Sequence, residues 1–284
     1  MAALPPYAST GQIAWHYGFR VICALVFLFL ILPILIIIPL SFTSSDFFTF
    51  TPEMLTLQAE GYSLRHYERF FNDSDWQIAL RNSFIIAPLA TLIATSIGTL
   101  AAVGLSQPHV PFRGAIMAML ISPMIVPLII SAAGMYFFYS RIGLQGTYLG
   151  VMLAHAALGT PFVIITVTAT LVGFDRSLVR AAQNLGAGPL TTFFKVQMPL
   201  ILPGVISGAL FAFITSFDEV VVVLFVGSAS QKTLPWQMFT GLREQISPTI
   251  LAVATILVTV SILLLTAVEL LRRRSERLRG MSPQ

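Results

Sequence analysis

Six long stretches of this sequence contain no charged side chain, and they restrict the chain to a membrane-spanning fold. They cover residues 21–45, 82–112, 114–140, 142–174, 196–217 and 245–268. A helix needs about 20 apolar residues to cross a hydrocarbon layer about 30 Å thick. With 56% hydrophobic and 10% charged residues, the composition also lies outside the range of soluble domains. The sequence therefore predicts an all-α membrane protein.

We expect six transmembrane helices, which we place near residues 20–41, 82–105, 114–139, 147–172, 201–226 and 249–271. An even number of spans puts both termini on the same side of the membrane. Arg20 precedes the first span, and five arginines follow the last one: Arg272, Arg273, Arg274, Arg277 and Arg279. Because lysine and arginine are enriched in cytoplasmic loops, the sequence predicts that both termini are cytoplasmic.

This topology divides the chain into three parts. Residues 1–19 form a cytoplasmic N-terminal segment, residues 20–272 form the transmembrane domain, and residues 273–284 form a basic cytoplasmic tail. The first 20 residues lack the basic start and short apolar stretch of a signal peptide, so we expect the first span to remain uncleaved. The basic tail is suited to anionic lipid headgroups, and no basic patch interleaved with aromatic residues favours nucleic acid.

The single cysteine, Cys23, lies in the first span. One cysteine excludes an intrachain disulfide and a cysteine metal cluster, so we expect no metal site. In the outer loop between the first two spans, Leu64, Tyr67 and Phe70 recur at helical spacing and Ser63 could cap the helix. An amphipathic surface helix is expected there, either as a packing element or with a ligand role.

A polar, glycine-interrupted segment on the cytoplasmic side, residues 174–203, has the layout of two short helices. Asp175 is a candidate N-cap for a helix over residues 176–185, and Gly186 would end it in a left-handed conformation. Pro189 is placed to begin a second helix and Pro199 to end it. The sequence thus predicts a helical hairpin over residues 174–199.

The first of these helices has two chemically different sides. Arg176, Arg180 and Asn184 are spaced four residues apart on one face, whereas Ala181 and Ala182 lie elsewhere and allow close packing. A small helix of this kind is suited to a groove on a partner protein.

The same segment resembles a known signature. R-A-A-Q-N-L-G, nine further residues and V-Q-M-P are similar to the E-A-A-x-x-x-G-x9-I-x-L-P motif of permease subunits in binding-protein-dependent ABC importers. Ala181, Ala182, Gly186 and Pro199 match the motif, and Arg180 replaces its usual glutamate. The resemblance implies the type I ABC importer permease fold and a multi-pass protein of the bacterial plasma (inner) membrane.

The resemblance also implies that the hairpin couples the chain to an ATPase. The residues expected to make that contact are Arg180, Ala181, Ala182, Asn184, Gly186, Ala187 and Pro189. The sequence has no G-x-x-x-x-G-K-[ST] phosphate loop, so ATP and Mg²⁺ would be held by the partner and the chain itself would need no cofactor. The implied partners are a second related permease, a dimer of ATP-binding subunits and a periplasmic or extracellular solute-binding protein.

Two acidic residues, Asp218 and Glu219, lie inside the fifth predicted span. A charge at the centre of a bilayer costs roughly 2.5 to 3.5 kcal/mol, so both should face protein or a watery path. A carboxylate on that path would favour a cationic solute. Alternatively, one or both could pair with a basic group or cap a break in the helix. Tyr136, Tyr139 and Trp236 are further candidates for the path, as cation-contacting aromatic residues or as belt residues.

Residues 216–257, with F-D-E-V-V-V, T-L-P-W-Q-M-F and I-S-P-T-I-L, are similar to the second permease of spermidine/putrescine-type importers. The resemblance implies transport of polyamines or related cationic amines, with an amino acid or 4-aminobutyrate as the alternative cargo. A membrane enzyme would have only His155 and the two adjacent carboxylates, too few converging groups for catalysis, and His155 alone is more typical of a packing residue. An energy-independent channel would not need the cytoplasmic hairpin.

Overall fold

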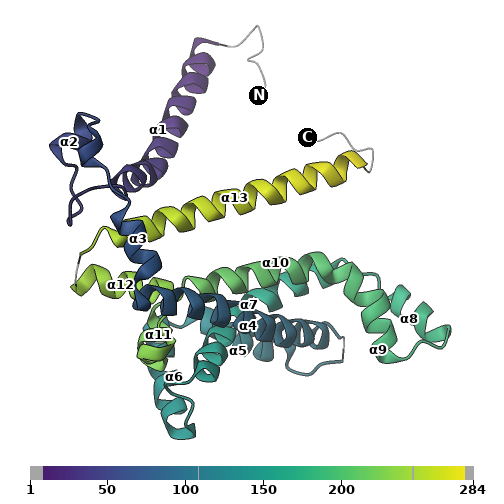
Figure 1. The fold of residues 1–284 in the computed structure, drawn as a ribbon. Helices are drawn as coiled ribbons and strands as arrows, with labels where there is room; N and C mark the ends of the chain where they lie inside the picture. The colour runs from purple at the N-terminus through teal and green to yellow at the C-terminus, as the bar shows by residue number, and fades with distance from the viewer. Residues whose placement is uncertain (1–8, 108, 245, 279–284) are drawn as a thin grey trace. The chain divides into compact units, whose positions relative to one another are not determined.

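The structure is a computed structural model that describes residues 9–107, 109–244 and 246–278. Its helices (Figure 1) are α1 Thr10–Leu40, α2 Pro52–Leu55, α3 Arg65–Asn72, α4 Ser74–Leu105, α5 Arg113–Ile125, α6 Leu128–Ile142, α7 Tyr148–Val172, α8 Ser177–Asn184, α9 Pro189–Thr192, α10 Met198–Phe217, α11 Val221–Val226, α12 Leu234–Glu244 and α13 Thr249–Leu278. The chain forms two units, of which one is Ser74–Thr240 and the other joins the residues before and after it. The all-α prediction is confirmed.

Within the described residues, four helical stretches are long and apolar enough to cross a membrane: α1, α4, α7 and the stretch from Pro189 to Phe217. The pair α5 and α6 adds a fifth if it is counted as one span. The apolar part of α13 over the described residues, Thr249–Leu263, is shorter than these. The count of six spans and the cytoplasmic termini therefore stay predictions.

The prediction that the third span, residues 114–139, is one continuous helix is wrong. It is divided into α5 and α6, whose axes differ by 103°. Val126 at the break is extended, with ψ of 136°, because the ring of Pro127 disfavours helical backbone in the residue before it. A proline in the middle of an apolar stretch thus turns the chain sharply.

The fifth predicted span, residues 201–226, is also interrupted. Helix α10 ends at Phe217, and the short α11 begins only at Val221. At its other end the helix extends further than expected, because α9 continues through a π-helical turn, Phe193–Gln197, directly into α10. The prediction that Pro199 ends the second helix is wrong: Pro199 lies in the first turn of α10, where its missing N–H is tolerated, and the wide π turn accommodates its ring.

The boundaries drawn at residues 19 and 272 fall inside helices. Helix α1 begins at Thr10, where Ser9 accepts a hydrogen bond from the backbone of Gln12 and the Gln12 side chain bonds back to Ser9, a capping box. Helix α13 continues to Leu278. Residues 1–8 of the predicted N-terminal segment and residues 279–284 of the predicted tail lie outside the described residues.

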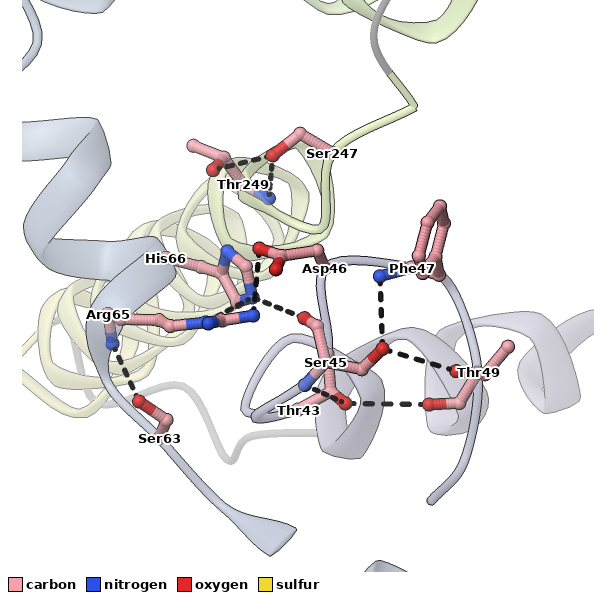
Figure 2. A network of polar contacts seen from close by, with 10 residues as sticks. All are labelled: Thr43, Ser45, Asp46, Phe47, Thr49, Ser63, Arg65, His66, Ser247 and Thr249. Carbon is pink, nitrogen blue, oxygen red and sulfur yellow. Dashed lines mark hydrogen bonds and ion pairs between the residues drawn. The ribbon is translucent and has the colours of Figure 1, made fainter.

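The segment between α1 and α4 contains α3, which confirms the expected helix, but Leu64 rather than Ser63 occupies its N-cap position. Figure 2 shows the polar contacts of this segment. Ser63 accepts a hydrogen bond from the backbone of Arg65 at 3.2 Å. Arg65 in turn pairs with Asp46 at 2.9 Å. The buried His66 donates from Nε2 to the carbonyl of Ser45 at 3.0 Å. Burial lowers the pKa of His66, so the neutral ring is favoured. Short polar bonds therefore hold the loop against α3.

The core of the unit Ser74–Thr240 consists of α4, α7 and α10, each of which packs against the other two. Helix α7 is the most enclosed of the three. In its apolar 18-residue stretch 61% of the residues are buried, compared with 33% for α4 and 33% for Pro189–Phe217, which contains α10. The α4 face toward this core is built largely from alanine, at Ala87, Ala90, Ala94 and Ala102. Small residues at helical spacing let helix backbones approach closely, which substitutes for the hydrophobic effect inside lipid.

Helices α4 and α7 approach closely at Gly98. A Cβ atom added there would lie 2.7 Å from Cβ of Val163 and 3.2 Å from the carbonyl oxygen of Thr160. Neither atom belongs to a flexible side-chain end, so the helices would have to separate. By contrast, a Cβ added at Gly104 on the same helix would meet no atom within 4 Å.

These two glycines give a matched test of the helix core. Alanine generally favours a helix by about 1 kcal/mol over glycine, so Gly104→Ala should leave the thermal unfolding temperature in detergent unchanged or raise it. Gly98→Ala should lower that temperature, because overpacking a tight core costs about 1 to 3 kcal/mol. Equal melting temperatures for the two variants would contradict the close packing.

Candidate functional site

The start of α8 is fixed by Asp175. Its carboxylate accepts hydrogen bonds from the hydroxyl of Ser177 at 2.7 Å and from the Ser177 backbone N–H at 2.8 Å. These bonds, in that order, and the nearby charge of Arg180 lower the pKa of Asp175. The helix begins at Ser177, one residue later than expected. The prediction that Asp175 is the N-cap residue is wrong: Arg176 occupies the N-cap position and makes no side-chain cap bond, and Asp175, one residue earlier, bonds to Ser177.

The end of α8 matches the sequence prediction. Gly186 has φ of +82°, a left-handed conformation that favours glycine, and the N–H of Ala187 donates to the carbonyl of Ala182 at 3.0 Å. After Gly188, Pro189 is the first residue of α9. The segment is therefore one short helix joined by a glycine turn to the long stretch that ends at Phe217, rather than a closed pair of short helices.

The surface of this segment is unusually apolar for a water-exposed turn. None of the residues from 174 to 191 is buried. Leu185 is 89% exposed and Leu190 is 74% exposed, and Leu178 and Phe194 are exposed as well. Of the predicted coupling residues, Arg180, Ala181, Asn184, Gly186 and Pro189 are exposed, and Ala182 and Ala187 are half-buried. Several exposed apolar residues on one short segment favour an interaction surface.

At the other end of α10, the break between α10 and α11 borders a hollow of about 390 Å³. The hollow is lined by Leu128 at the start of α6 and by residues of the break, including Asp218. The interruption of the third span and that of the fifth therefore meet at one place. Irregular backbone at membrane depth is tolerated only where it is enclosed by protein or lines a cavity.

The two acidic residues at the break have different environments. Both residues line the hollow, but Asp218 is exposed whereas Glu219 is only 7% exposed. Oε1 of Glu219 accepts a hydrogen bond from the backbone N–H of Val222 at 2.8 Å, so Glu219 caps one free N–H at the start of α11 from the position before the N-cap residue Val220. The alternative that an acidic residue caps a helix break thus holds for Glu219, and Asp218 is the carboxylate that points to open space.

The aromatic candidates lie mainly in the core. Tyr139 is buried with Ala132, Val151 and Val222, and Trp236 packs against the same cluster. Tyr136 is half-buried, and its ring lies 5.4 Å from that of Phe137 in an edge-to-face arrangement. None of the three is among the residues that line the hollow beside Asp218.

His155 is a buried contact between α7 and α10. Its Nδ1 lies 2.9 Å from the hydroxyl of Ser216, within hydrogen-bonding distance. Within the described part of the chain, no group of three histidine, cysteine, aspartate or glutamate side chains could hold a metal ion. The environment of His155 is that of a packing residue.

A polar cluster on the loop before α12 was missed by the sequence analysis. The buried amide of Asn82 donates to the carbonyls of Ser230 and Lys232, both at 2.8 Å, and accepts from the hydroxyl of Tyr148 at 2.8 Å. Lys232 also pairs with Asp75. Asn82 is the first residue of the uncharged stretch 82–112. A polar residue at the start of such a stretch was the sequence signal that could have indicated this cluster. The cluster fastens the loop to the starts of α4 and α7.

Comparisons with solved structures define the class of fold. A bacterial ABC transporter involved in the import of the acidic polysaccharide alginate aligns with a TM-score of 0.73 at 17% identity, covering 94% of this chain and 99% of its own. The same kind of transporter in complex with an alginate-bound periplasmic protein aligns with a TM-score of 0.63 at 14% identity, covering 96% and 98%. The fold is that of an ABC importer permease.

Sequence relatives identify the family. Residues 94–278 match the family described as binding-protein-dependent transport system inner membrane component. The spermidine/putrescine transport system permease protein PotC of Haemophilus influenzae is 32% identical, over 88% of this chain and 94% of its own. The putrescine transport system permease protein PotI of Escherichia coli is 33% identical, over 84% of each chain. The chain belongs to this family of multi-pass inner membrane transport permeases.

The capping role of Glu219 leads to a stability prediction. Glu219→Ala should lower the free energy of unfolding by about 1 kcal/mol, the usual effect of losing a helix cap, whereas Glu219→Gln should retain most of it because the amide oxygen can still accept from Val222. Asp218→Ala, at the exposed neighbour, serves as the control. Thermal unfolding in detergent measures all three, and an equal loss for Glu219→Gln and Glu219→Ala would rule out capping.

Proposed function

We propose that the chain is a transmembrane subunit of an ATP-driven importer for polyamines or related small cationic amines. The observation that carries the cargo class is Asp218, an exposed carboxylate at a helix break, beside a hollow that the irregular parts of two spans border. An unpaired carboxylate at such a place attracts cations and repels anions. The similarity to permeases named for spermidine and putrescine, over most of the chain, supports the same cargo.

The fold alone does not select this cargo. The solved structures with the same fold belong to a transporter of an acidic polysaccharide, a solute of opposite charge. Residues at the path must therefore distinguish these solutes. Asp218 is the residue of this chain that we assign to that task, whereas Tyr136, Tyr139 and Trp236 would contribute by shaping the surrounding core.

We also propose that segment 174–199 couples the chain to an ATPase. The residues we assign to this contact are Arg180, Ala181, Ala182, Asn184, Gly186, Ala187 and Pro189. The exposed leucines at 185 and 190 are positioned to fill a groove on that subunit. The partner would hold ATP and Mg²⁺ and supply the energy. A second related permease would complete the path, and a solute-binding protein would deliver the cargo from outside.

The test of the proposed function is transport by the reconstituted complex. Proteoliposomes with the chain, its second permease, the ATPase subunits and the solute-binding protein should import labelled spermidine or putrescine only when ATP is present. A neutral sugar should not be imported. Import of 4-aminobutyrate or another amino acid in place of the polyamines would show that the cargo assignment is wrong.

Asp218→Asn should lower polyamine uptake by about tenfold, the effect of removing a partly hydrated charge interaction of ~1.4 kcal/mol. Asp46→Asn is the matched control, because Asp46 belongs to an exposed ion pair with Arg65 and such pairs contribute little. Unchanged uptake in Asp218→Asn would contradict the electrostatic role of Asp218.

A further inference from the structure

A cleft of about 470 Å³ lies between α8 and the turn that follows α4. One side is formed by Arg176, Arg180 and Gln183, and the other by Ser106, Gln107 and His109. The turn looks like a simple connector in the sequence, with prolines at both ends. In the structure it forms half of a concave, polar surface beside the segment assigned to the ATPase.

The two sides of the cleft are joined by one bond. The guanidinium of Arg176 donates to the carbonyl oxygen of Ser106, the first residue beyond the end of α4. A cation at the C-terminal end of a helix is stabilised by the helix dipole and satisfies a carbonyl that has no partner within the helix. Helix α8 and the end of α4 are thus held together.

The charged residues that line the cleft are all basic. Among the described residues that line it, two are arginines, one is histidine and none is acidic. The nearest acidic neighbour in sequence, Asp175, already binds Ser177 through both carboxylate oxygens. Each guanidinium has five N–H donors in a planar fork that matches a carboxylate, and the amides of Gln107 and Gln183 add further donors at the rim.

We propose that this cleft receives an acidic side chain of the ATPase subunit, so that the docking surface consists of Arg176 and α8 together with Ser106, Gln107 and His109 of the turn after α4. The proposal rests on the proposed function, because it concerns the chemistry of the same contact. A protein partner fits better than a lipid headgroup, because the two segments that line the charged cleft also carry exposed apolar residues: Leu185 follows α8, and Phe112, 84% exposed, precedes α5. A groove on a protein can cover charged and apolar groups together.

The first test measures binding of the ATPase subunit to the assembled permease pair at several salt concentrations. Arg180→Glu should weaken binding about tenfold, the loss of one charge-assisted interaction, and should reduce its dependence on salt. Arg141→Glu is the matched control, because Arg141 is exposed, lies outside segment 174–199 and does not line the cleft. Equal effects of the two variants, or no effect of Arg180→Glu, would overturn the proposal.

A second measurement does not depend on the folding of a charge-reversed variant. A photo-crosslinking amino acid placed at position 180 of the assembled complex should attach to a peptide of the ATPase subunit that contains aspartate or glutamate. Attachment to a peptide without an acidic residue would contradict the proposal, as would attachment to lipid.

Lipid binding is measured separately with vesicles of phosphatidylglycerol and of phosphatidylcholine. If Arg180→Glu weakens binding to the anionic vesicles and leaves ATPase binding intact, the cleft is a headgroup site and the proposal is wrong. If the ATPase subunit binds and drives transport normally in Arg180→Glu, the charge assignment is wrong but the proposed function stands. If the wild-type chain binds no ATPase subunit, the proposed function itself is wrong.

Discussion

Close packing of α4, α7 and α10 is the constraint on which the rest of the unit Ser74–Thr240 depends. At Gly98 the backbones of α4 and α7 approach so closely that one added carbon atom would overlap Val163. Lipid offers no hydrophobic driving force between helices, so contact area and hydrogen bonds must hold them. The buried pair His155 and Ser216 contributes one such bond between α7 and α10. This three-helix core provides a firm support for the irregular segments at both ends of α10.

Helix α10 connects the two regions to which we assign function. Through α9 and the π-helical turn it is continuous with the glycine turn after α8 (Figure 1). At its other end it stops at Phe217, next to Asp218 and the hollow. The bond from Arg176 to Ser106 joins α8 to α4 as well. A displacement imposed on α8 therefore has two helical routes into the core. This arrangement suits a subunit that receives energy from a partner at one end and guides a solute at the other.

Local signals in the sequence predicted local structure well. The left-handed turn at Gly186 and the helix start at Pro189 each depend on backbone preferences of a few adjacent residues, which a sequence reveals directly, whereas the N-cap position was predicted one residue too early. The break at Pro127 was missed because an uncharged apolar stretch looks the same whether it is straight or bent, whereas the break at Asp218 was one of two alternatives that its charges left open. Whether a proline bends such a stretch depends on the helices around it, and only the fold supplies that information.

The central claim is that the segment around Gly186 transmits ATP hydrolysis to transport, and the number of amines imported per ATP hydrolysed by the reconstituted complex tests it most directly. Gly186→Val should keep ATP hydrolysis but lower this ratio, because a β-branched residue strains the left-handed turn. Gly186→Asn should stay near the wild-type ratio, since asparagine tolerates that conformation. A wild-type ratio in Gly186→Val would contradict the account.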